Sequence, residues 1–277
     1  MIAPDKIAVI FLVYGDKHIS SGIGCIQSIL SRMFKNVAIE YLVVDNSLPV
    51  GFVRKKKNYE YIGGDNSLWE FSGWDLGYTY LKQKGVFTDT TLVLFANDTF
   101  HRRAYKNGGD FLSVFDKDIV QDKDVLRSAI GYMDDFPTNV SLNGISYNSW
   151  IRSNIFFLPY NIVEILYPLS ITIDERIIFS FDLDKFWSDT DFISDNWKAY
   201  ISSWLFGIEN KKFPEYRLHW IKSEPLTSEN HDFFRKKALC ILSEHYLSAR
   251  IHDLGIQIID TNIFEKKPDR HISPYYL

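Results

Sequence analysis

The chain has 277 residues and a formal net charge of −4, with 46% hydrophobic and 24% charged residues. This composition is typical of a folded protein with a sizeable core and argues against long disordered segments. The acidic balance argues against a nucleic-acid partner, which would need a basic face. An aromatic content of 16% favours a protein that binds sugar rings or planar bases, although large cores also use aromatic residues.

The sequence predicts a protein of the reducing cytoplasm. Its two cysteines, Cys25 and Cys240, lie far apart and suggest neither a disulfide framework nor a zinc site. The N-terminal residues lack the basic region and apolar core that are typical of a signal peptide, and no apolar run is long enough to cross a bilayer. The one tight basic run, Arg54 to Lys57, is interpreted as a solvated loop, with contact to the inner face of an anionic cytoplasmic membrane as the alternative.

Apolar runs alternate with helical patterns over the first hundred residues. The expected strands are Lys6 to Tyr14, Ala38 to Val44, Tyr59 to Ile62 and Thr91 to Ala96. The expected helices between them are Ser21 to Met33 and Trp69 to Leu81. This order predicts an α/β fold with a mostly parallel central sheet, flanked by helices and joined by right-handed crossovers.

Small polar residues follow three of these strands. The three clusters are Asp45-Asn46-Ser47, Asp65-Asn66 and Asn97-Asp98-Thr99. Each cluster alone is explained by a polar turn, and Gly63-Gly64 by a loop that needs positive φ. Repetition at successive strand ends favours one ligand site, because ligands of open α/β sheets bind at the carboxyl ends of the strands.

These strand ends resemble the donor-binding half of GT-A glycosyltransferases, whose fold is Rossmann-like. In that family the first strand ends near a hydroxyl or aromatic residue, the second in V-V-D-N-S, and a later one in N-D-D or D-x-D. The matching residues here are Val13-Tyr14, followed by Gly15, then Val43 to Ser47 and Asn97 to Thr99. Gly64 to Ser67, followed by Glu70 to Trp74, is similar to the glycine- and asparagine-containing loop between them.

The resemblance implies a nucleotide-sugar donor, dTDP- or UDP-linked. Asp45 would meet the base or ribose, and Asp98 would face the diphosphate, either directly or through a divalent metal, Mn or Mg. The second carboxylate of the family pattern is missing here, so metal dependence stays open. The implied donor-binding residues are Val13, Tyr14, Gly15, Asp45, Asn46, Asp65, Asn66, Asn97, Asp98 and Thr99.

A strand is expected over Ser149 to Leu158, followed by a helix over Asn161 to Leu166. Its residues loosely match the segment H-x-Q-S-x-F-x-x-F of rhamnan-synthesis-type glycosyltransferases. By this resemblance Trp150, Arg152 and Ser153 contact the acceptor or the donor sugar, and Trp74 joins the same substrate-binding group. A core strand is the alternative for the apolar residues, whereas a cation such as Arg152 before a buried strand suits a phosphate or carboxylate.

The last predicted helix, Lys236 to Ile251, ends before Gly255. Its segment Ser243 to Ser248 is similar to the family's E-x-x-L-S helix and resembles the E-D motif of related inverting enzymes. The resemblance implies that Glu244 is the general base and that His245 contacts the substrate. Asp191, in an acidic and aromatic stretch, is the reserve candidate for the base. An exposed helical glutamate without a role is the alternative for Glu244.

The sequence thus predicts one GT-A domain, with a donor-binding half over 1–110, an acceptor-binding and catalytic half over 111–265 and a C-terminal arm over 266–277. The expected activity transfers a sugar from dTDP-rhamnose or a UDP-sugar, with inversion, to a growing bacterial surface polysaccharide or lipopolysaccharide glycan such as O-antigen. The acceptor would be a glycan or lipid-linked glycan, and peripheral contacts would involve the membrane or other polysaccharide-assembly enzymes.

Two other functions stay open. One is a non-catalytic α/β module that binds a glycan or a nucleotide through its aromatic residues. The other is a nucleotidyltransferase, which would need a glycine-rich basic loop after the first strand. Residues Ser20 to Gly24 contain two glycines, but Lys17 is the only nearby cation upstream.

Overall fold

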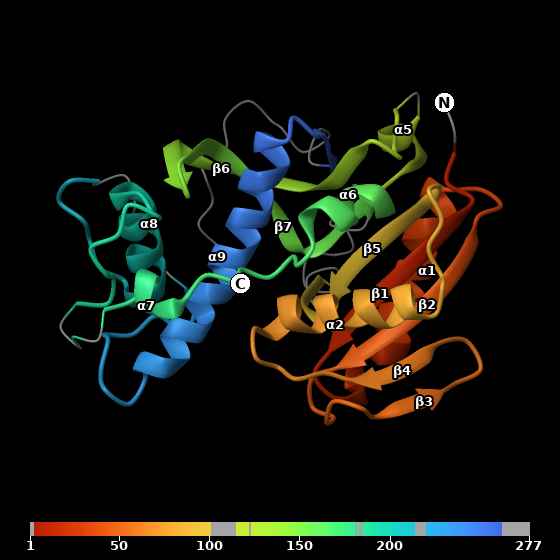
Figure 1. Ribbon diagram of the computed structural model, residues 1–277, viewed down its shortest axis with the longest axis horizontal. Helices are drawn as coiled ribbons and strands as arrows, with labels where there is room; N and C mark the ends of the chain where they lie inside the picture. Colours follow the sequence, from red (N-terminus) through yellow and green to blue (C-terminus); the bar gives the residue numbers. More distant parts are fainter. Residues whose placement is uncertain are drawn as a thin grey trace.

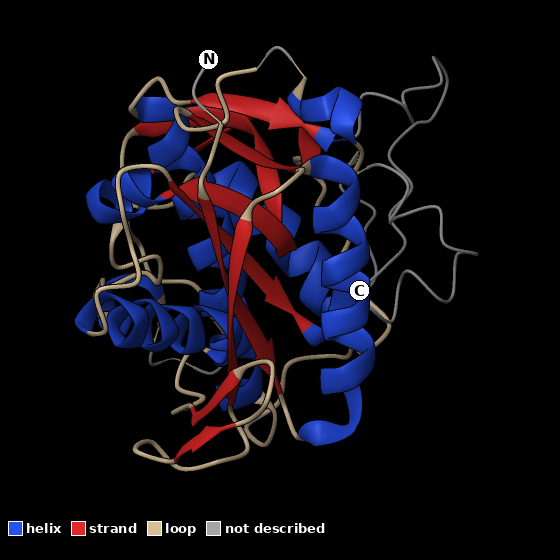
Figure 2. Cartoon of the chain, turned by 90° about the vertical axis from the view of Figure 1, so that its right-hand side faces the viewer, coloured by secondary structure: helices blue, strands red, loops and turns tan. Residues whose placement is uncertain are grey.

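The computed structural model describes residues 3–100, 115–121, 123–180, 182, 185–213 and 220–261. Within them the protein is an α/β structure, built on an eight-stranded, mostly parallel mixed sheet that helices flank (Figures 1 and 2). This agrees with the α/β class and the mostly parallel, helix-flanked sheet predicted from the sequence. The predicted C-terminal arm, 266–277, and the predicted boundary at 110 lie outside the described residues.

Strands and helices alternate through the first hundred residues, as the apolar runs predict. The strands are β1 (Lys6–Val13), β2 (Ala38–Asp45), β3 (Val53–Lys55), β4 (Glu60–Gly63) and β5 (Thr91–Asn97). The helices are η1 (Asp16–His18), α1 (Ile19–Met33) and α2 (Trp69–Gln83). Strand β3 contains part of the basic run that was predicted to be a solvated loop, because Val53 to Lys55 pair with β4 at the sheet edge.

The remaining elements contain longer strands and a long final helix. The strands are β6 (Ser128–Leu142), β7 (Ile145–Pro159) and β8 (Gln257–Asp260). The helices are α5 (Lys117–Val120), α6 (Tyr160–Leu166), α7 (Glu175–Ile178), α8 (Asp195–Phe206) and α9 (His231–Asp253). No helix in the described part of the chain combines the length and apolar character that a membrane crossing requires.

The strand order is β3-β4-β2-β1-β5-β7-β6-β8. Strands β4, β2, β1 and β5 are parallel, whereas β7 runs antiparallel to both β5 and β6. The β6–β7 hairpin was predicted only in part. Its turn is Asn143-Gly144, with φ of 51° and 76°, the residue pair and backbone conformation that favour a tight hairpin turn.

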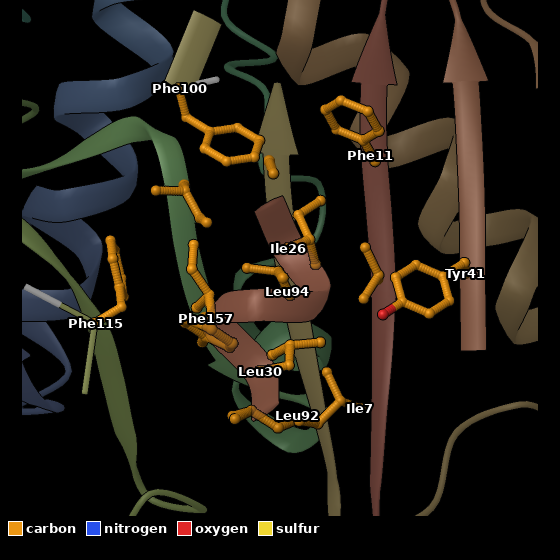
Figure 3. Packing of buried hydrophobic residues seen from close by; sticks show 14 of the residues in the cluster. Ile7, Phe11, Ile26, Leu30, Tyr41, Leu92, Leu94, Phe100, Phe115 and Phe157 are labelled. Carbon is orange, nitrogen blue, oxygen red and sulfur yellow. The ribbon is translucent and has the colours of Figure 1, made fainter. Parts of the chain in front are cut away.

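Two apolar layers cover the sheet because successive strand residues point to opposite faces. Ile7, Val9 and Phe11 of β1 pack against the α1 face, where Figure 3 shows Phe11, Leu94 and Phe157 with Ile26 and Leu30 of α1. The alternate β1 residues Ala8, Ile10 and Leu12 pack on the opposite face with side chains of α2, α6 and α9.

A third apolar cluster lies beyond the sheet, around α8 and the far end of the β6–β7 hairpin (Figure 1). It includes Phe136 and Leu142 of β6, Trp197 and Leu205 of α8, and Phe234 of α9. Helix α9 also contributes Cys240, Leu247 and Ile251 to the sheet layer. It therefore packs between the sheet and the third cluster, and this position determines where its polar residues lie.

Candidate functional site at the carboxyl edge of the sheet

The parallel strands end at one edge of the sheet and bring the predicted polar residues together. Val13 lies level with Asp45 of β2, and Leu12 lies level with Asn97 of β5. Because β1 separates β2 from β5, the two polar strand ends are roughly 10 Å apart. The sequence-predicted convergence of Asp45, Asn97 and Asp98 at one edge therefore agrees with the sheet topology.

Asp45 organises the strand ends from inside the protein. Its Oδ1 accepts from the backbone N–H groups of Gly15 and Ser47, both at 2.8 Å, and its Oδ2 accepts from the hydroxyl of Tyr61. Burial opposes the charged form, but these bonds outweigh it and hold the pKa of Asp45 below its usual value. The side chain is only 1% exposed. The predicted contact between this carboxylate and a base or ribose is therefore corrected to a structural role.

The loop after β1 presents one aromatic ring to solvent. Val13 is fully buried, whereas Tyr14 is 67% exposed. Gly15 follows with a φ of 83°, which suits glycine, and its N–H donates to Asp45. Among these three predicted donor residues, Tyr14 is the one whose side chain is available to a ligand.

The loop before α2 is built around Asn46. The Asn46 Nδ2 donates to the carbonyl of Trp69 at 2.8 Å and to Asn66 Oδ1 at 3.2 Å. Asn66 and Trp69 have φ of 54° and 49°, a conformation that L-residues adopt at a cost and that is often found at functional sites. Asp65 is exposed and accepts from Ser67, so its carboxylate also shapes this loop.

Gly63 and Gly64 do not have positive φ, which corrects the prediction for this pair. Both are needed for close approach instead. A Cβ on Gly64 would lie 2.0 Å from Asn46 Oδ1, and one on Gly63 would lie 2.0 Å from the carbonyl oxygen of Pro49.

At the end of β5, Asn97 caps the turn that carries Asp98. Its Oδ1 accepts from the N–H of Thr99 at 3.0 Å and from the Thr99 hydroxyl. Its Nδ2 donates to the carbonyl of Ser153 on β7 at 3.5 Å. Asp98 is buried, and residues 98–100 begin a helical turn. Asn97 therefore links the strand end to the neighbouring strand.

Strand β7 bulges where it passes this edge. Tyr132 is the only β6 residue between the pairs Gly131–Phe156 and Met133–Ile151, so it faces the segment 152–155 of β7. Such bulges redirect side chains and are frequent beside active sites. Ser153, in this bulge, accepts from Asn97 and donates through its N–H to Glu244 Oε1 and through Oγ to Glu70 Oε1, the latter at 3.4 Å.

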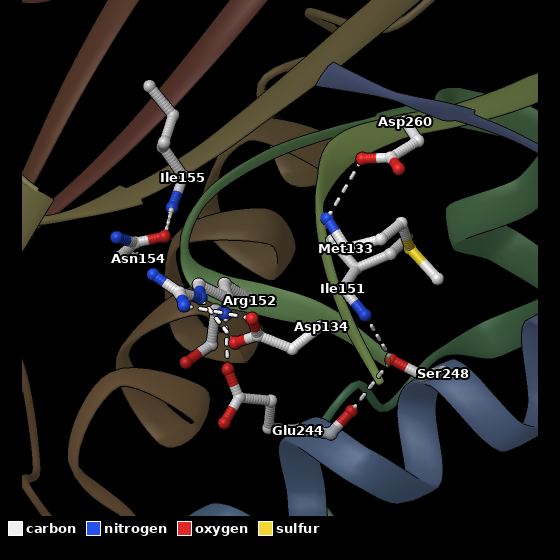
Figure 4. Close-up of polar contacts among 10 residues, drawn as sticks. Met133, Asp134, Ile151, Arg152, Asn154, Ile155, Glu244, Ser248 and Asp260 are labelled. Atoms are coloured by element: carbon white, nitrogen blue, oxygen red, sulfur yellow. Dashed lines mark hydrogen bonds and ion pairs between the residues drawn. The ribbon is translucent and has the colours of Figure 1, made fainter. Parts of the chain in front are cut away.

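Glu244 projects from α9 toward the β7 bulge (Figure 4), where its Oε1 accepts from the Ser153 N–H. Ser248, one turn later, keeps α9 on β7: its Oγ accepts from the N–H of Ile151 at 3.0 Å and donates to the Glu244 carbonyl at 3.1 Å. Loss of hydration raises the pKa of Glu244 to about 7; the Ser153 N–H lowers it and the nearby charge of Glu70 raises it. A carboxyl group that titrates near neutral pH suits proton transfer.

Two residues that sequence reasoning did not select lie beside Glu244. Glu70 begins α2 and approaches Ser153. Lys237 lies two helical turns before Glu244, and its Nζ is 5.0–5.4 Å from the ring centres of Trp69, Trp204 and Trp220. Glu70 stands in the matched segment Glu70 to Trp74, and Lys237 has a seven-residue helical spacing from Glu244; both signals were available in the sequence.

Arg152 lies next to Ser153 but is bound within the protein. Its guanidinium forms two hydrogen bonds with the carboxylate of Asp134 and lies 4.4 Å from the centre of the Tyr132 ring (Figure 4). Arg152 thus pairs with an internal carboxylate, which corrects the prediction that it pairs with a phosphate or carboxylate of the substrate. Its side chain remains partly exposed beside the site.

Three predicted substrate contacts are core residues. Trp74 is fully buried and donates to the carbonyl of Ala96 at 3.2 Å. Trp150 is 8% exposed and packs against Phe136 and His245. His245 accepts from the Trp197 indole N–H at 2.9 Å, and burial lowers its pKa to about 3. The prediction that these side chains bind the acceptor is corrected because none of them reaches the surface of the site.

Asp191 is exposed in the turn before α8, outside the cluster around Ser153. The predicted metal at Asp98 finds no support in the donor set, because the described residues contain no group of three His, Cys, Asp or Glu side chains arranged to bind a metal ion. The local geometry thus separates the reserve base, Asp191, from the site and leaves Glu244 in it.

Comparison with known protein families, with curated proteins and with solved structures returns no match for this chain.

Proposed function

We propose that this chain is a nucleotide-sugar-dependent glycosyltransferase with a GT-A-type donor half. The observation that carries the proposal is the position of Glu244, which titrates near neutral pH and is bonded to the β7 bulge beside the carboxyl ends of parallel strands. Open α/β sheets bind ligands at that edge, and a group that exchanges a proton at this place suits group transfer to a hydroxyl.

The donor binds at the ends of β1, β2 and β5 in this proposal. Tyr14 offers an exposed ring on which a base can stack. The resemblance of Val43 to Ser47 and of Asn97 to Thr99 to GT-A donor residues favours a nucleotide sugar, and the resemblance of the β7 segment to rhamnan-synthesis-type enzymes favours dTDP-rhamnose, with a UDP-sugar as the other candidate.

The proposed chemistry is displacement at the anomeric carbon. Glu244 takes the proton of the acceptor hydroxyl while that oxygen forms a bond to the anomeric carbon. The bond from this carbon to the diphosphate oxygen breaks, and its electron pair leaves with the nucleoside diphosphate. A single base on the acceptor side leads to inversion, and base assistance of this kind contributes roughly 10²–10⁴-fold to the rate.

The acceptor in this proposal is a hydroxyl of a growing bacterial surface polysaccharide or lipopolysaccharide glycan. A divalent metal at Asp98 stays a prediction, and no step of this proposal depends on it. Lys237, whose cation has three indole rings around it, lies on α9 two helical turns before Glu244.

The test measures binding and transfer separately. Thermal shift against UDP, dTDP, GDP and CMP identifies the nucleotide, because a ligand that binds only the folded state raises its melting temperature. Transfer from the matching labelled nucleotide sugar is then compared in wild type and Glu244→Gln. We expect kcat to fall by about 10²–10⁴-fold while the nucleotide shift stays unchanged.

Glu60→Gln is the matched control, because Glu60 lies at the amino end of β4, level with Leu42 in the middle of β2, and is paired with Lys84 rather than with the Ser153 cluster. It should retain wild-type transfer. A Glu244→Gln variant with wild-type kcat would remove Glu244 from the mechanism. A nucleotide shift without transfer or hydrolysis of any nucleotide sugar would identify a binding module instead.

A further inference from the structure

Ser153 joins two carboxylates that come from distant parts of the chain. Its backbone N–H donates to Glu244 Oε1 on α9, and its hydroxyl donates to Glu70 Oε1 at the start of α2. Glu70 is partly buried, and the residue before it, Trp69, packs against the Lys237 ammonium group of α9. The first turn of α2 is thus attached to α9 through Trp69 and to β7 through Glu70.

The other groups that act on Glu244 come from α9 and β7. Lys237 and Cys240 are on α9 itself, and Arg152 and Tyr147 are on β7. Arg152 is already paired with Asp134, and Lys237 is surrounded by three indole rings. Within this set Glu70 supplies the like charge that favours the protonated form of Glu244, since two neighbouring carboxylates resist simultaneous ionisation.

We propose that Glu70 is a positioning residue for Glu244: its bond to the Ser153 hydroxyl fixes the β7 bulge whose N–H holds Glu244, and its carboxylate places a second negative charge beside that of Glu244. This inference rests on the proposed function for its catalytic consequence, but the coupling between the two carboxylates is a property of the folded protein alone. Glu70 itself does not contact the reacting atoms in this arrangement.

The coupling is measured without substrate. The protein is labelled with ¹³C at glutamate side-chain carboxyl groups, and the Glu244 signal is assigned by its loss in Glu244→Gln. We expect the titration midpoint of Glu244 to fall by roughly one pH unit in Glu70→Gln, because a like charge has been removed. Glu70→Asp keeps the charge and should retain most of the wild-type midpoint.

Glu60→Gln again serves as the control for loss of one distant carboxylate, and circular dichroism confirms that each variant folds. A Glu244 midpoint in Glu70→Gln equal to that in Glu60→Gln would overturn the proposal. If transfer is observed, the rising limb of kcat against pH should move to lower pH by the same amount. A shifted midpoint without any transfer would retain the coupling and reject only the glycosyltransferase assignment.

Discussion

Neighbouring polar residues at the end of β2 have different tasks because they point to opposite faces of the sheet. The carboxylate of Asp45 is buried and accepts from Tyr61, whose ring packs in the α1 layer. Asn46 reaches instead toward α2 and holds the loop around Trp69. A single Asp-Asn pair therefore supports the loop after β1 on one side and the start of α2, which carries Glu70, on the other.

A substitution at Gly64 tests how much the hydrogen bonds of Asn46 contribute to stability. We expect Gly64→Ala to destabilise the protein by about 1–3 kcal/mol, because its Cβ would press on Asn46 Oδ1 and disturb the bonds of Nδ2. Urea unfolding followed by tryptophan fluorescence measures the loss. The nucleotide thermal shift should fall in parallel if the Asn46 loop supports the donor site.

Gly24→Ala is the matched control for this substitution. Gly24 lies in α1 with open space around its Cβ position. Alanine is preferred to glycine in a helix by about 1 kcal/mol, so this variant should be neutral or more stable. Equal stability of the two variants would show that Asn46 accommodates a methyl group at Gly64.

At the scale of one element, α9 has several roles because successive helical residues point about 100° apart. Ser243 and Ser248 anchor it to the 167–171 loop and to β7, through the N–H groups of Ile171 and Ile151. Glu244 faces the site, whereas His245 enters the aromatic core beside Trp197. Adjacent residues of one motif thus face different surroundings, the polar cluster around Ser153 and the aromatic core.

Asp75 on α2 holds the loop that follows α6. Its carboxylate accepts from the N–H groups of Leu169 and Ser170, at 2.8 and 3.1 Å, and from the Ser170 hydroxyl. We expect Asp75→Ala to lower the free energy of unfolding by about 2–4 kcal/mol, because these partly buried donors lose their acceptor. Urea unfolding monitored by circular dichroism provides the measurement.

Asp89→Ala is the control for Asp75, since Asp89 is an exposed residue of the turn between α2 and β5. Its free energy of unfolding should stay within about 0.5 kcal/mol of wild type. If Asp75→Ala were as stable as Asp89→Ala, the loop would not depend on α2. The Arg250 guanidinium, which donates to the carbonyls of Leu166 and Pro168, would then be its main support.

At the scale of the whole molecule, the buried His245 and the partly buried Glu244 make opposite contributions to stability as pH changes. The pKa of His245 is lowered from 6.5 to about 3, so its contribution is complete above pH 6.5 and is lost as pH falls. The pKa of Glu244 is raised from 4.5 to about 7, so its contribution is complete below pH 4.5 and is lost as pH rises toward 7. Between pH 4.5 and pH 6.5, acidification reduces the contribution of His245 and increases that of Glu244, so the two changes in the free energy of unfolding offset each other.

Glu244→Gln should reveal this compensation. The variant still loses stability on acidification, because His245 is unchanged. It no longer loses stability on alkalinisation, because it has no carboxyl group at position 244 to ionise. We expect its free energy of unfolding, relative to wild type, to increase from pH 4.5 to pH 7 by at most about 3 kcal/mol. Urea titrations at half-unit pH steps measure the difference, and a difference that stays constant with pH would show that Glu244 keeps an ordinary pKa.

The sequence by itself determined the alternating strands and helices of the first hundred residues, because apolar runs and turn residues are local signals. It also placed polar residues at the ends of strands that proved to share one edge. The Asn143-Gly144 pair of the long hairpin is also a local signal, because this residue pair favours a tight turn. The sequence did not predict that β3 belongs to the sheet. This exposed basic segment forms a strand because its backbone pairs with β4 at the edge of the sheet, and residue types alone do not specify that pairing.

Only the tertiary structure decided which of the polar residues meet. Ser153 lies 83 residues from Glu70 and 91 from Glu244 in sequence, and no local pattern joins them. The bulge in β7 turns Ser153 toward both, and the packing of α9 between two apolar layers sends Glu244 to the site and His245 to the core. Burial and side-chain direction depend on distant neighbours, and a pattern of residue types specifies neither.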